Sequence, residues 1–195
     1  MATARSIIWT KRIHVSESRA VVGKCHSHAL APQRRTLRCV LLRSRPDLRG
    51  EWEKDKQNSD LEAYGRMLSL IGLTGLKKTG ALKLINGLVI EQNAQPPQLV
   101  VRYVVSRVQF LPQTLESFAL DQQTQMPRRD GQPGSQTATL NEFENSIQTI
   151  ITWGKPNPVS LTETYTVHHD FLTVLALVEA QHQTVTCKQV FKRTS

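Results

Sequence analysis

The sequence predicts an all-β protein with one short helix pair, folded as an up-and-down antiparallel β-barrel of about ten strands behind a basic N-terminal leader. Three observations support this prediction. Short β-rich runs divided by turn residues recur about every ten residues after Gly87. Two helical stretches precede most of these runs. The whole excess of positive charge lies ahead of both helices.

The first 45 residues have the composition of an organellar transit peptide. Residues 1–49 contain eleven Lys or Arg against two acidic residues, whereas residues 50–195 contain fourteen of each sign. The leader is rich in Arg and Ser and lacks the apolar stretch of a secretory signal. We expect residues 1–45 to be a disordered or loosely helical leader to the chloroplast or another plastid, with a mitochondrial address as the alternative. A nucleic-acid arm, or a mis-assigned start that would leave the protein in the cytoplasm, are the other interpretations.

The composition of the remainder excludes several classes of protein. A body without net charge has no broad attraction for phosphate backbones, so no nucleic-acid partner is expected. No apolar run reaches the roughly 18–20 residues of a membrane-spanning helix, so no stable membrane insertion is expected. Removal of the leader takes away Cys25 and Cys39 and leaves Cys187, which suits a reducing compartment and a buried structural role. No zinc-ligand spacing occurs, so no metal is expected. We also expect a monomer without a cofactor.

The domain is predicted to span residues 48–195 and to begin with a short strand that contains Trp52. Ser59, with Glu62 three residues later, resembles a capping box, and apolar residues at helical spacing follow as far as Ile71. A second helix is expected over residues 74–85, ended by Asn86-Gly87. The pair, residues 60–85, would cover one end of the barrel as a lid.

The remaining strands are expected to connect as antiparallel neighbours, because the turns are too short for parallel crossovers. Closure into a barrel removes exposed edges, and a β-sandwich is the competing architecture. The helix pair favours the barrel, whose wide mouth needs a cover. The expected strands are residues 88–92, 99–108, 114–118, 125–129, 136–143, 147–153, 161–167, 171–178 and 184–191.

The order of these segments resembles the intracellular fatty-acid-binding proteins of the calycin superfamily, whose lipocalin branch also opens with Gly-x-Trp. The resemblance covers about residues 48–193, nearly the whole body. Each motif is weak alone, and their order and spacing carry the comparison. The motifs are Gly50-x-Trp52, Ser59-Asp60-Leu61-x-x-Tyr64-x-Arg66-x-Leu68, Thr152-Trp153-Gly154 and the closing run from Thr184 to Arg193.

The resemblance implies a ten-stranded barrel around a cavity, a helical portal, and a fatty-acid carboxylate anchored by arginines and a tyrosine. The closing strand of that family carries an Arg-x-Tyr pair, and the matching positions here are Gln189 and Phe191. A glutamine offers only neutral hydrogen bonds, typically about half as strong as those of an arginine. An ionised carboxylate buried without a cation would be costly. We therefore expect a ligand that is neutral or weakly polar, such as an isoprenoid, a pigment fragment, a retinoid-like molecule or an acyl ester.

The expected function is non-enzymatic carriage of this hydrophobic small molecule inside an organelle. Gln189 and Phe191 are the expected ligand-binding residues from the resemblance. Strand position adds three further candidates, Tyr165 and either Arg102 or Arg107 as a relocated anchor. The expected portal residues are Tyr64, Leu68 and Leu76.

Other functions remain open at this stage. Glu163 shares a strand face with Tyr165; it is expected on the solvent side near the mouth, but an inward pair could act in a barrel isomerase or cyclase of lipid-derived substrates. Haem ligation would use histidines expected in exposed turns. A barrel with a filled interior could serve as an interaction module. The histidines are His168, His169 and His182, and Arg128-Arg129-Asp130 is expected to be a solvated turn.

Overall fold

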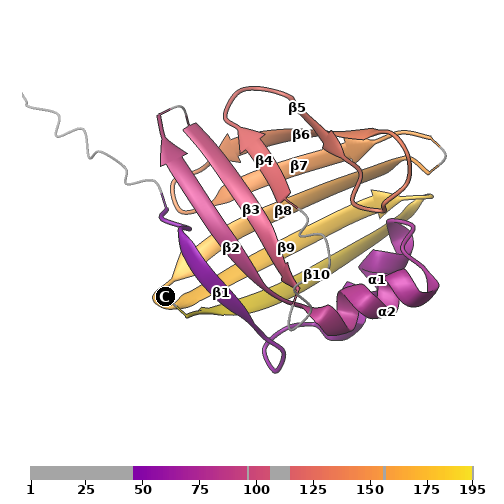
Figure 1. Ribbon diagram of the computed structural model, residues 1–195, viewed down its shortest axis with the longest axis horizontal. Helices are drawn as coiled ribbons and strands as arrows, with labels where there is room; N and C mark the ends of the chain where they lie inside the picture. The colour runs from indigo at the N-terminus through magenta and orange to yellow at the C-terminus, as the bar shows by residue number, and fades with distance from the viewer. Residues whose placement is uncertain (1–45, 96, 106–114, 156, 195) are drawn as a thin grey trace, which may run out of the picture. The chain divides into compact units, whose positions relative to one another are not determined.

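Ten antiparallel strands and two helices make up the part of the chain that the structure describes (Figure 1). This computed structural model describes residues 46–95, 97–105, 115–155 and 157–194, and the expected leader lies outside these ranges. The elements are β1 (Gly50–Asp55), α1 (Leu61–Leu70), α2 (Gly75–Leu84), β2 (Ile85–Ala94), β3 (Pro97–Val105), β4 (Leu115–Ala119), β5 (Thr124–Pro127), β6 (Ser135–Glu142), β7 (Ile147–Trp153), β8 (Val159–His168), β9 (Phe171–Ala180) and β10 (Gln183–Arg193).

The strands form one sheet in the order β4-β3-β2-β1-β10-β9-β8-β7-β6-β5. Pairing of β1 with β10 joins the beginning and the end of the domain, and the sheet curls until its two edge strands approach each other. A 3.4 Å hydrogen bond from the Ala119 amide to Thr124 Oγ1 links the two edges, and a parallel bridge joins Leu120, just after β4, to Leu140 on β6. The barrel predicted from the sequence is therefore confirmed as a nearly closed one.

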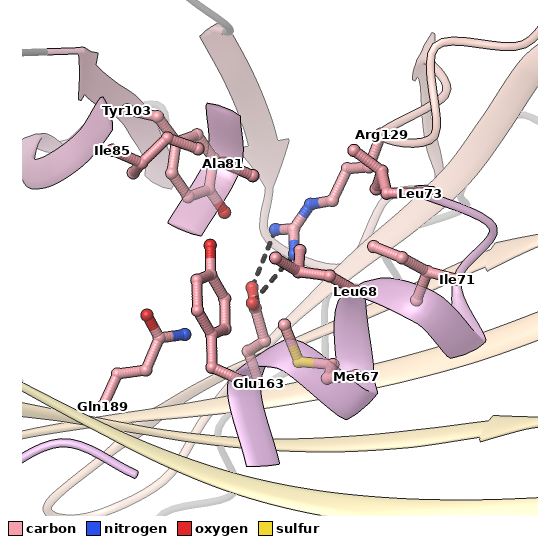
Figure 2. A pocket seen from close by; sticks show the side chains of 11 residues that line it. Met67, Leu68, Ile71, Leu73, Ala81, Ile85, Tyr103, Arg129, Glu163 and Gln189 are labelled. Carbon is pink, nitrogen blue, oxygen red and sulfur yellow. Dashed lines mark hydrogen bonds and ion pairs between the residues drawn. The ribbon is translucent and has the colours of Figure 1, made fainter. Parts of the chain in front are cut away.

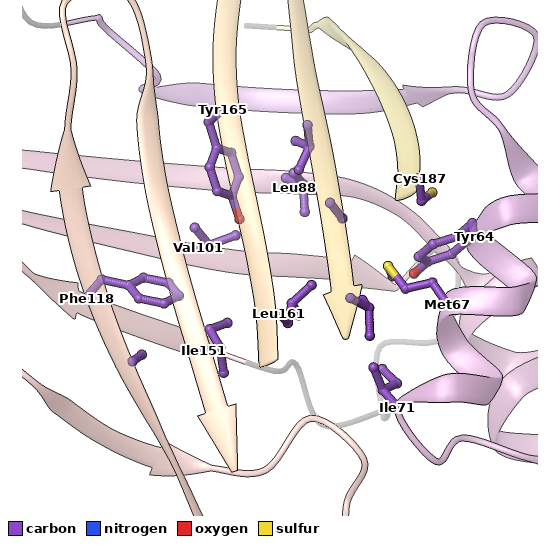
Figure 3. Close-up of a cluster of buried hydrophobic side chains, with 14 of the residues drawn as sticks. Tyr64, Met67, Ile71, Leu88, Val101, Phe118, Ile151, Leu161, Tyr165 and Cys187 are labelled. Atoms are coloured by element: carbon purple, nitrogen blue, oxygen red, sulfur yellow. The ribbon is translucent and has the colours of Figure 1, made fainter. Parts of the chain in front are cut away.

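Alternation along the strands separates the barrel interior from solvent. On β9 the side chains of Leu172, Val174, Ala176 and Val178 are buried, while Leu175 between them is exposed. This period of two is the signal that the sequence displays, because successive strand residues face opposite sides of a sheet. Figure 3 shows the inward side chains of several strands gathered opposite those of α1. Each fully buried leucine contributes about 2 kcal/mol of transfer free energy.

Trp52 on β1 belongs to the buried core and is 2% exposed. Its indole Nε1 donates to the carbonyl oxygen of Leu48 at 2.9 Å, and the Arg193 guanidinium lies 4.2 Å from its ring centroid. Gly87 on the adjacent strand β2 packs against the backbone of Trp52, so that a Cβ at this position would lie 2.4 Å from the Trp52 carbonyl oxygen. The glycine that the sequence suggested as a helix stop is therefore needed for a close backbone contact within the sheet.

The helix pair covers one end of the sheet interior (Figure 1). The expected cap is wrong by one residue: Asp60 is the N-cap of α1 and accepts from the Ala63 amide at 2.8 Å. The Ser59 hydroxyl instead donates to the carbonyl oxygen of Asp55 at 2.6 Å and accepts from the Val190 amide at 2.9 Å. This bonding ties the start of α1 to β1 and β10. Within the described ranges, neither helix is long and apolar enough to cross a bilayer.

Candidate functional site

A cavity lies between the helix pair and the interior of the barrel (Figure 2). Its volume is about 90 Å³, and a further space of about 20 Å³ is lined by Tyr165 and Phe191. The two spaces share five lining residues, so we treat them as one cavity. Most of the lining is apolar, and α1 contributes Met67 and Leu68. The polar lining residues are Tyr64, Tyr103, Arg129, Glu163, Tyr165 and Gln189.

A buried cluster of three charges occupies one wall of this cavity. Arg129 follows β5, and its guanidinium binds the carboxylate of Glu116 on β4 through Nε and Nη2, both at 2.6 Å. The same guanidinium binds Glu163 on β8 through Nη1 and Nη2, both at 2.8 Å (Figure 2). The side chains are only 10%, 2% and 4% exposed. Arg129 therefore uses four of its five N–H donors to connect the edge strands β4 and β5 with β8 inside the sheet.

Neutral groups complete the hydrogen bonding of the two carboxylates. The Tyr165 hydroxyl donates to Glu163 Oε2 at 2.8 Å, and Gln136 Nε2 donates to Glu116 Oε1 at 3.3 Å. Gln136 also fixes the position of Arg129, because its Oε1 accepts from the Arg129 backbone amide at 2.9 Å. Such full satisfaction is what a buried charge requires.

Arg129 and Glu163 hold each other in the charged form. Burial opposes ionisation of Glu163, but the adjacent Arg129 and the Tyr165 hydroxyl hold the pKa of Glu163 below its ordinary value. Burial likewise opposes the charge of Arg129, and the carboxylates of Glu116 and Glu163 raise its pKa well above the ordinary value. Burial and the neighbouring carboxylate raise the pKa of Tyr165, which therefore stays a hydrogen-bond donor. None of Arg129, Glu163 and Tyr165 is therefore poised to exchange a proton near neutral pH.

A second polar group lies where α1 meets β1 and β10. Lys54 is 7% exposed; its Nζ donates to Gln189 Oε1 at 2.7 Å and lies 3.8 Å from the ring centroid of Tyr64. Burial lowers the pKa of Lys54 to about 8. Cys187 is also buried here, and burial raises the pKa of its thiol to about 11, so it remains protonated.

The structure brings three of the five expected ligand-binding residues to the cavity. Gln189, Phe191 and Tyr165 line it, from β10 and β8. The expectation for Arg102 is wrong, because its neighbours on β3 face inward and it pairs on the outer surface with Glu91 at 3.1 Å. Arg107 lies outside the described residues.

Of the three expected portal residues, Tyr64 and Leu68 line the cavity from α1. Leu76 does not, because it lies on the first turn of α2 with 90% of its surface exposed. The sequence placed it on the inner face of a second amphipathic helix, but no residue of α2 is buried.

Two further expectations are wrong because they placed in solvent residues that the structure buries. Glu163 faces the cavity and not the solvent, and the Arg128-Arg129-Asp130 turn is not solvated. Arg128 and Asp130 are each 3% exposed and form a two-point ion pair at 2.5 and 3.1 Å. Arg128 Nη1 also donates to the Lys155 carbonyl oxygen at 2.8 Å, which holds the turn against the end of β7.

Sequence reasoning missed Glu116, Arg129 and Lys54. The signal for Glu116 and Lys54 was available, since each occupies an inward position in an alternating strand, between Leu115 and Ser117 and two residues after Trp52 respectively. Arg129 follows the last residue of β5, so strand alternation does not orient it.

The three histidines are exposed, and two of them lie in turns, as expected. His169 belongs to the β8–β9 turn and His182 to the β9–β10 turn, at opposite ends of β9, whereas His168 is the last residue of β8. A ten-residue strand separates its ends by about 30 Å, so these turns cannot share a ligand. Among the described residues, no three His, Cys, Asp or Glu side chains are grouped so that they could hold a metal ion.

Comparison with known proteins defines the fold. The sequence matches no protein-family model and no curated protein. Among solved structures, fatty-acid-binding protein 1 of Echinococcus granulosus (13% identity, TM-score 0.59) and human cRBP IV (20%, 0.57) each cover 76% of this chain over 98% of their own length. Lipid binding protein 8 of Caenorhabditis elegans (14%, 0.60) covers 77% of this chain over 99% of its length. The predicted resemblance is thus confirmed for the fold.

Proposed function

We propose, on the basis of a fatty-acid-binding-protein fold whose cavity arginine is already neutralised, that this protein binds and carries a small hydrophobic molecule with an uncharged polar head. The observation that supports this proposal is the engagement of Arg129 by both Glu116 and Glu163. The apolar part of the ligand would bind by burial against Met67, Leu68 and the other apolar lining residues, at about 25 cal/mol per Å².

A ligand carboxylate would bind unfavourably at this wall of the cavity. It would have to displace Glu116 or Glu163 from Arg129 and leave that side chain as a buried, unpaired charge, at a cost of several kcal/mol. It would also approach the carboxylate of Glu163, which Arg129 keeps ionised. A neutral hydroxyl, carbonyl or ester group meets neither penalty.

The amide of Gln189 is one polar group of the lining that remains available to a neutral ligand. An ammonium can only donate, so the Gln189 atom that contacts Lys54 Nζ is the oxygen, and the amide nitrogen faces away from the lysine. Figure 2 shows this nitrogen on the side of the other lining residues. Gln189 can therefore donate to a ligand oxygen.

The similar structures agree with hydrophobic-ligand binding in general. They include fatty-acid-binding and lipid-binding proteins and a zebrafish ileal bile acid-binding protein complexed with cholic acid (13% identity, TM-score 0.53). The isoprenoid, pigment or retinoid-like classes are finer proposals within this group.

Displacement of a fluorescent apolar probe tests the proposal. We expect decanol and methyl decanoate to displace the probe at lower concentration than decanoate by at least ~10-fold, because only decanoate pays the charge penalty. Gln189→Leu should weaken decanol several-fold through the lost hydrogen bond. Decanoate binding that equals decanol binding would defeat the neutral-head proposal. If such binding also disappears in Lys54→Met, Lys54 is a carboxylate anchor instead.

A barrel isomerase or cyclase is the second candidate, because Glu163 and Tyr165 form a hydrogen-bonded pair inside the cavity. Proton transfer at neutral pH would require a carboxyl group poised near pH 7, whereas Arg129 keeps Glu163 ionised. Incubation with lipid epoxides decides the matter. Product formed by the wild type and lost in Glu163→Gln would establish an enzyme.

We also propose that residues 1–45 direct the protein to an organelle, in the first instance a plastid. The charge asymmetry between the leader and the neutral body supports this proposal. Residues 1–45 fused to a fluorescent protein should carry it into plastids. Accumulation in mitochondria would select the alternative address, and diffuse cytoplasmic fluorescence would refute the transit-peptide interpretation.

A further inference from the structure

The buried amine of Lys54 lies beside two residues that line the cavity. Its side chain points inward from β1, and within the described ranges its Nζ has no ion-pair partner. Its two contacts, Gln189 Oε1 at 2.7 Å and the Tyr64 ring at 3.8 Å, are both to residues that line the cavity. A buried ammonium so weakly compensated is costly, and loss of its charge relieves that cost.

The neighbouring glutamine presents the complementary group. Because Gln189 Oε1 faces Lys54, the Gln189 amide nitrogen can donate to a carbonyl oxygen in the cavity. Both atoms belong to one amide group, so a carbonyl held on the nitrogen lies one amide group away from the lysine amine. The apolar chain of such a ligand could extend past Met67 and Leu68.

We propose that Lys54, whose amine contacts two residues of the cavity lining, is a covalent attachment site for long-chain aldehydes, with which it forms an imine at the edge of the cavity. This inference rests on the proposed function, since an aldehyde is a hydrophobic ligand with an uncharged head. The neutral Nζ adds to the carbonyl carbon, and the carbonyl oxygen then leaves as water with the two protons that the amine carried. The carbon–nitrogen double bond replaces the carbon–oxygen one, so no oxidant or reductant is needed.

The surroundings of Lys54 favour the neutral, nucleophilic amine. Burial lowers its pKa to about 8; the nearby Cys187 acts in the opposite direction and Lys56 in the same direction. Relative to an ordinary lysine, the neutral fraction at pH 7.5 rises by ~200-fold. Tyr64 from α1 stays protonated because burial raises its pKa. Cys187 stays a thiol for the same reason, so the amine is the stronger nucleophile of the two.

Reductive trapping of the full-length protein tests this proposal. Decanal and cyanoborohydride are added at pH 7.5, and peptide mapping gives the rate at which each lysine gains one decyl group. Lys192, exposed on β10, is the internal control. We expect Lys54 to be alkylated at least ~10-fold faster than Lys192, and decanol to suppress the reaction at Lys54 but not at Lys192. In Lys54→Arg, which keeps the charge, the fast-reacting site should disappear.

The comparison of Lys54 with Lys192 within the wild type needs no variant, so a poorly folded Lys54→Arg does not prevent a decision. Equal labelling of the two lysines, or labelling of Lys54 that decanol does not suppress, would overturn the proposal. Displacement of the fluorescent probe by decanol is measured separately. If decanol binds and Lys54 is not labelled, only the attachment site fails, whereas absence of decanol binding removes the carrier function itself.

Discussion

Replacement of Arg129 by methionine should destabilise the fold strongly at neutral pH. The variant leaves Glu116 and Glu163, 2% and 4% exposed, facing the same space without a cation. Removal of one partner from a buried pair costs about 3–5 kcal/mol, and two carboxylates are stranded here, so we expect the upper end of that range. Proton uptake by one carboxyl group limits the loss, which should therefore be smaller at pH 5 than at pH 7.5.

Urea unfolding followed by tryptophan fluorescence gives the free energy of unfolding for this comparison. Arg102→Met is the matched control, because Arg102 forms a solvent-exposed pair with Glu91 and should lose no more than about 0.5 kcal/mol. The triple variant with Glu116→Gln and Glu163→Gln should recover much of the loss, since it removes the stranded charges. A loss for Arg129→Met as small as that for Arg102→Met would refute the buried cluster.

The remaining predictions concern Lys54, Gly87 and Asp60. Burial lowers the pKa of Lys54 from 10.5 to about 8, so between these pH values the folded chain binds fewer protons than the unfolded chain and its stability rises with pH. The rise amounts to at most about 3 kcal/mol, and Lys54→Met should lack it. Measurement of the free energy of unfolding at pH 7–10 tests this. Gly87→Ala should cost about 2 kcal/mol or more, because its Cβ meets the Trp52 carbonyl. Gly154→Ala, with no neighbour within 4 Å, should be nearly neutral. Thermal melts that do not separate the two variants would contradict the close contact between Gly87 and Trp52. Asp60→Ala should cost about 1 kcal/mol through the lost N-cap bond to α1, and an unchanged urea midpoint would show that this cap contributes nothing.

The sequence predicts the barrel well because its evidence is local. Alternation along residues 171–178 and the turn residues between strands depend only on neighbours in the chain, and β9 begins at the predicted Phe171. The helix pair is found for the same reason. The N-cap is misassigned because both Ser59 and Asp60 can cap a helix, and only the position of β10 decides that Ser59 binds Val190 instead.

The charged part of the site could not be predicted from the sequence, because it is formed by long-range contacts. Glu116, Arg129 and Glu163 lie on three segments, and each alone is most favourably placed in solvent. Burial becomes acceptable only when all three meet. The neutral-ligand expectation was drawn from Gln189 alone, yet the stronger support comes from Arg129, a residue that the sequence placed in a solvated turn.

Whether Arg129 is withheld from the ligand by its two carboxylates is the central claim, and one comparison tests it most directly. Affinities for decanol and decanoate are measured by probe displacement in the wild type and in the Glu116→Gln, Glu163→Gln double variant. We expect the wild type to prefer decanol by at least ~10-fold and the double variant, whose Arg129 has lost both counterions, to bind decanoate more tightly than the wild type does. A wild type that binds decanoate at least as tightly as decanol, with no gain in the double variant, would contradict the claim.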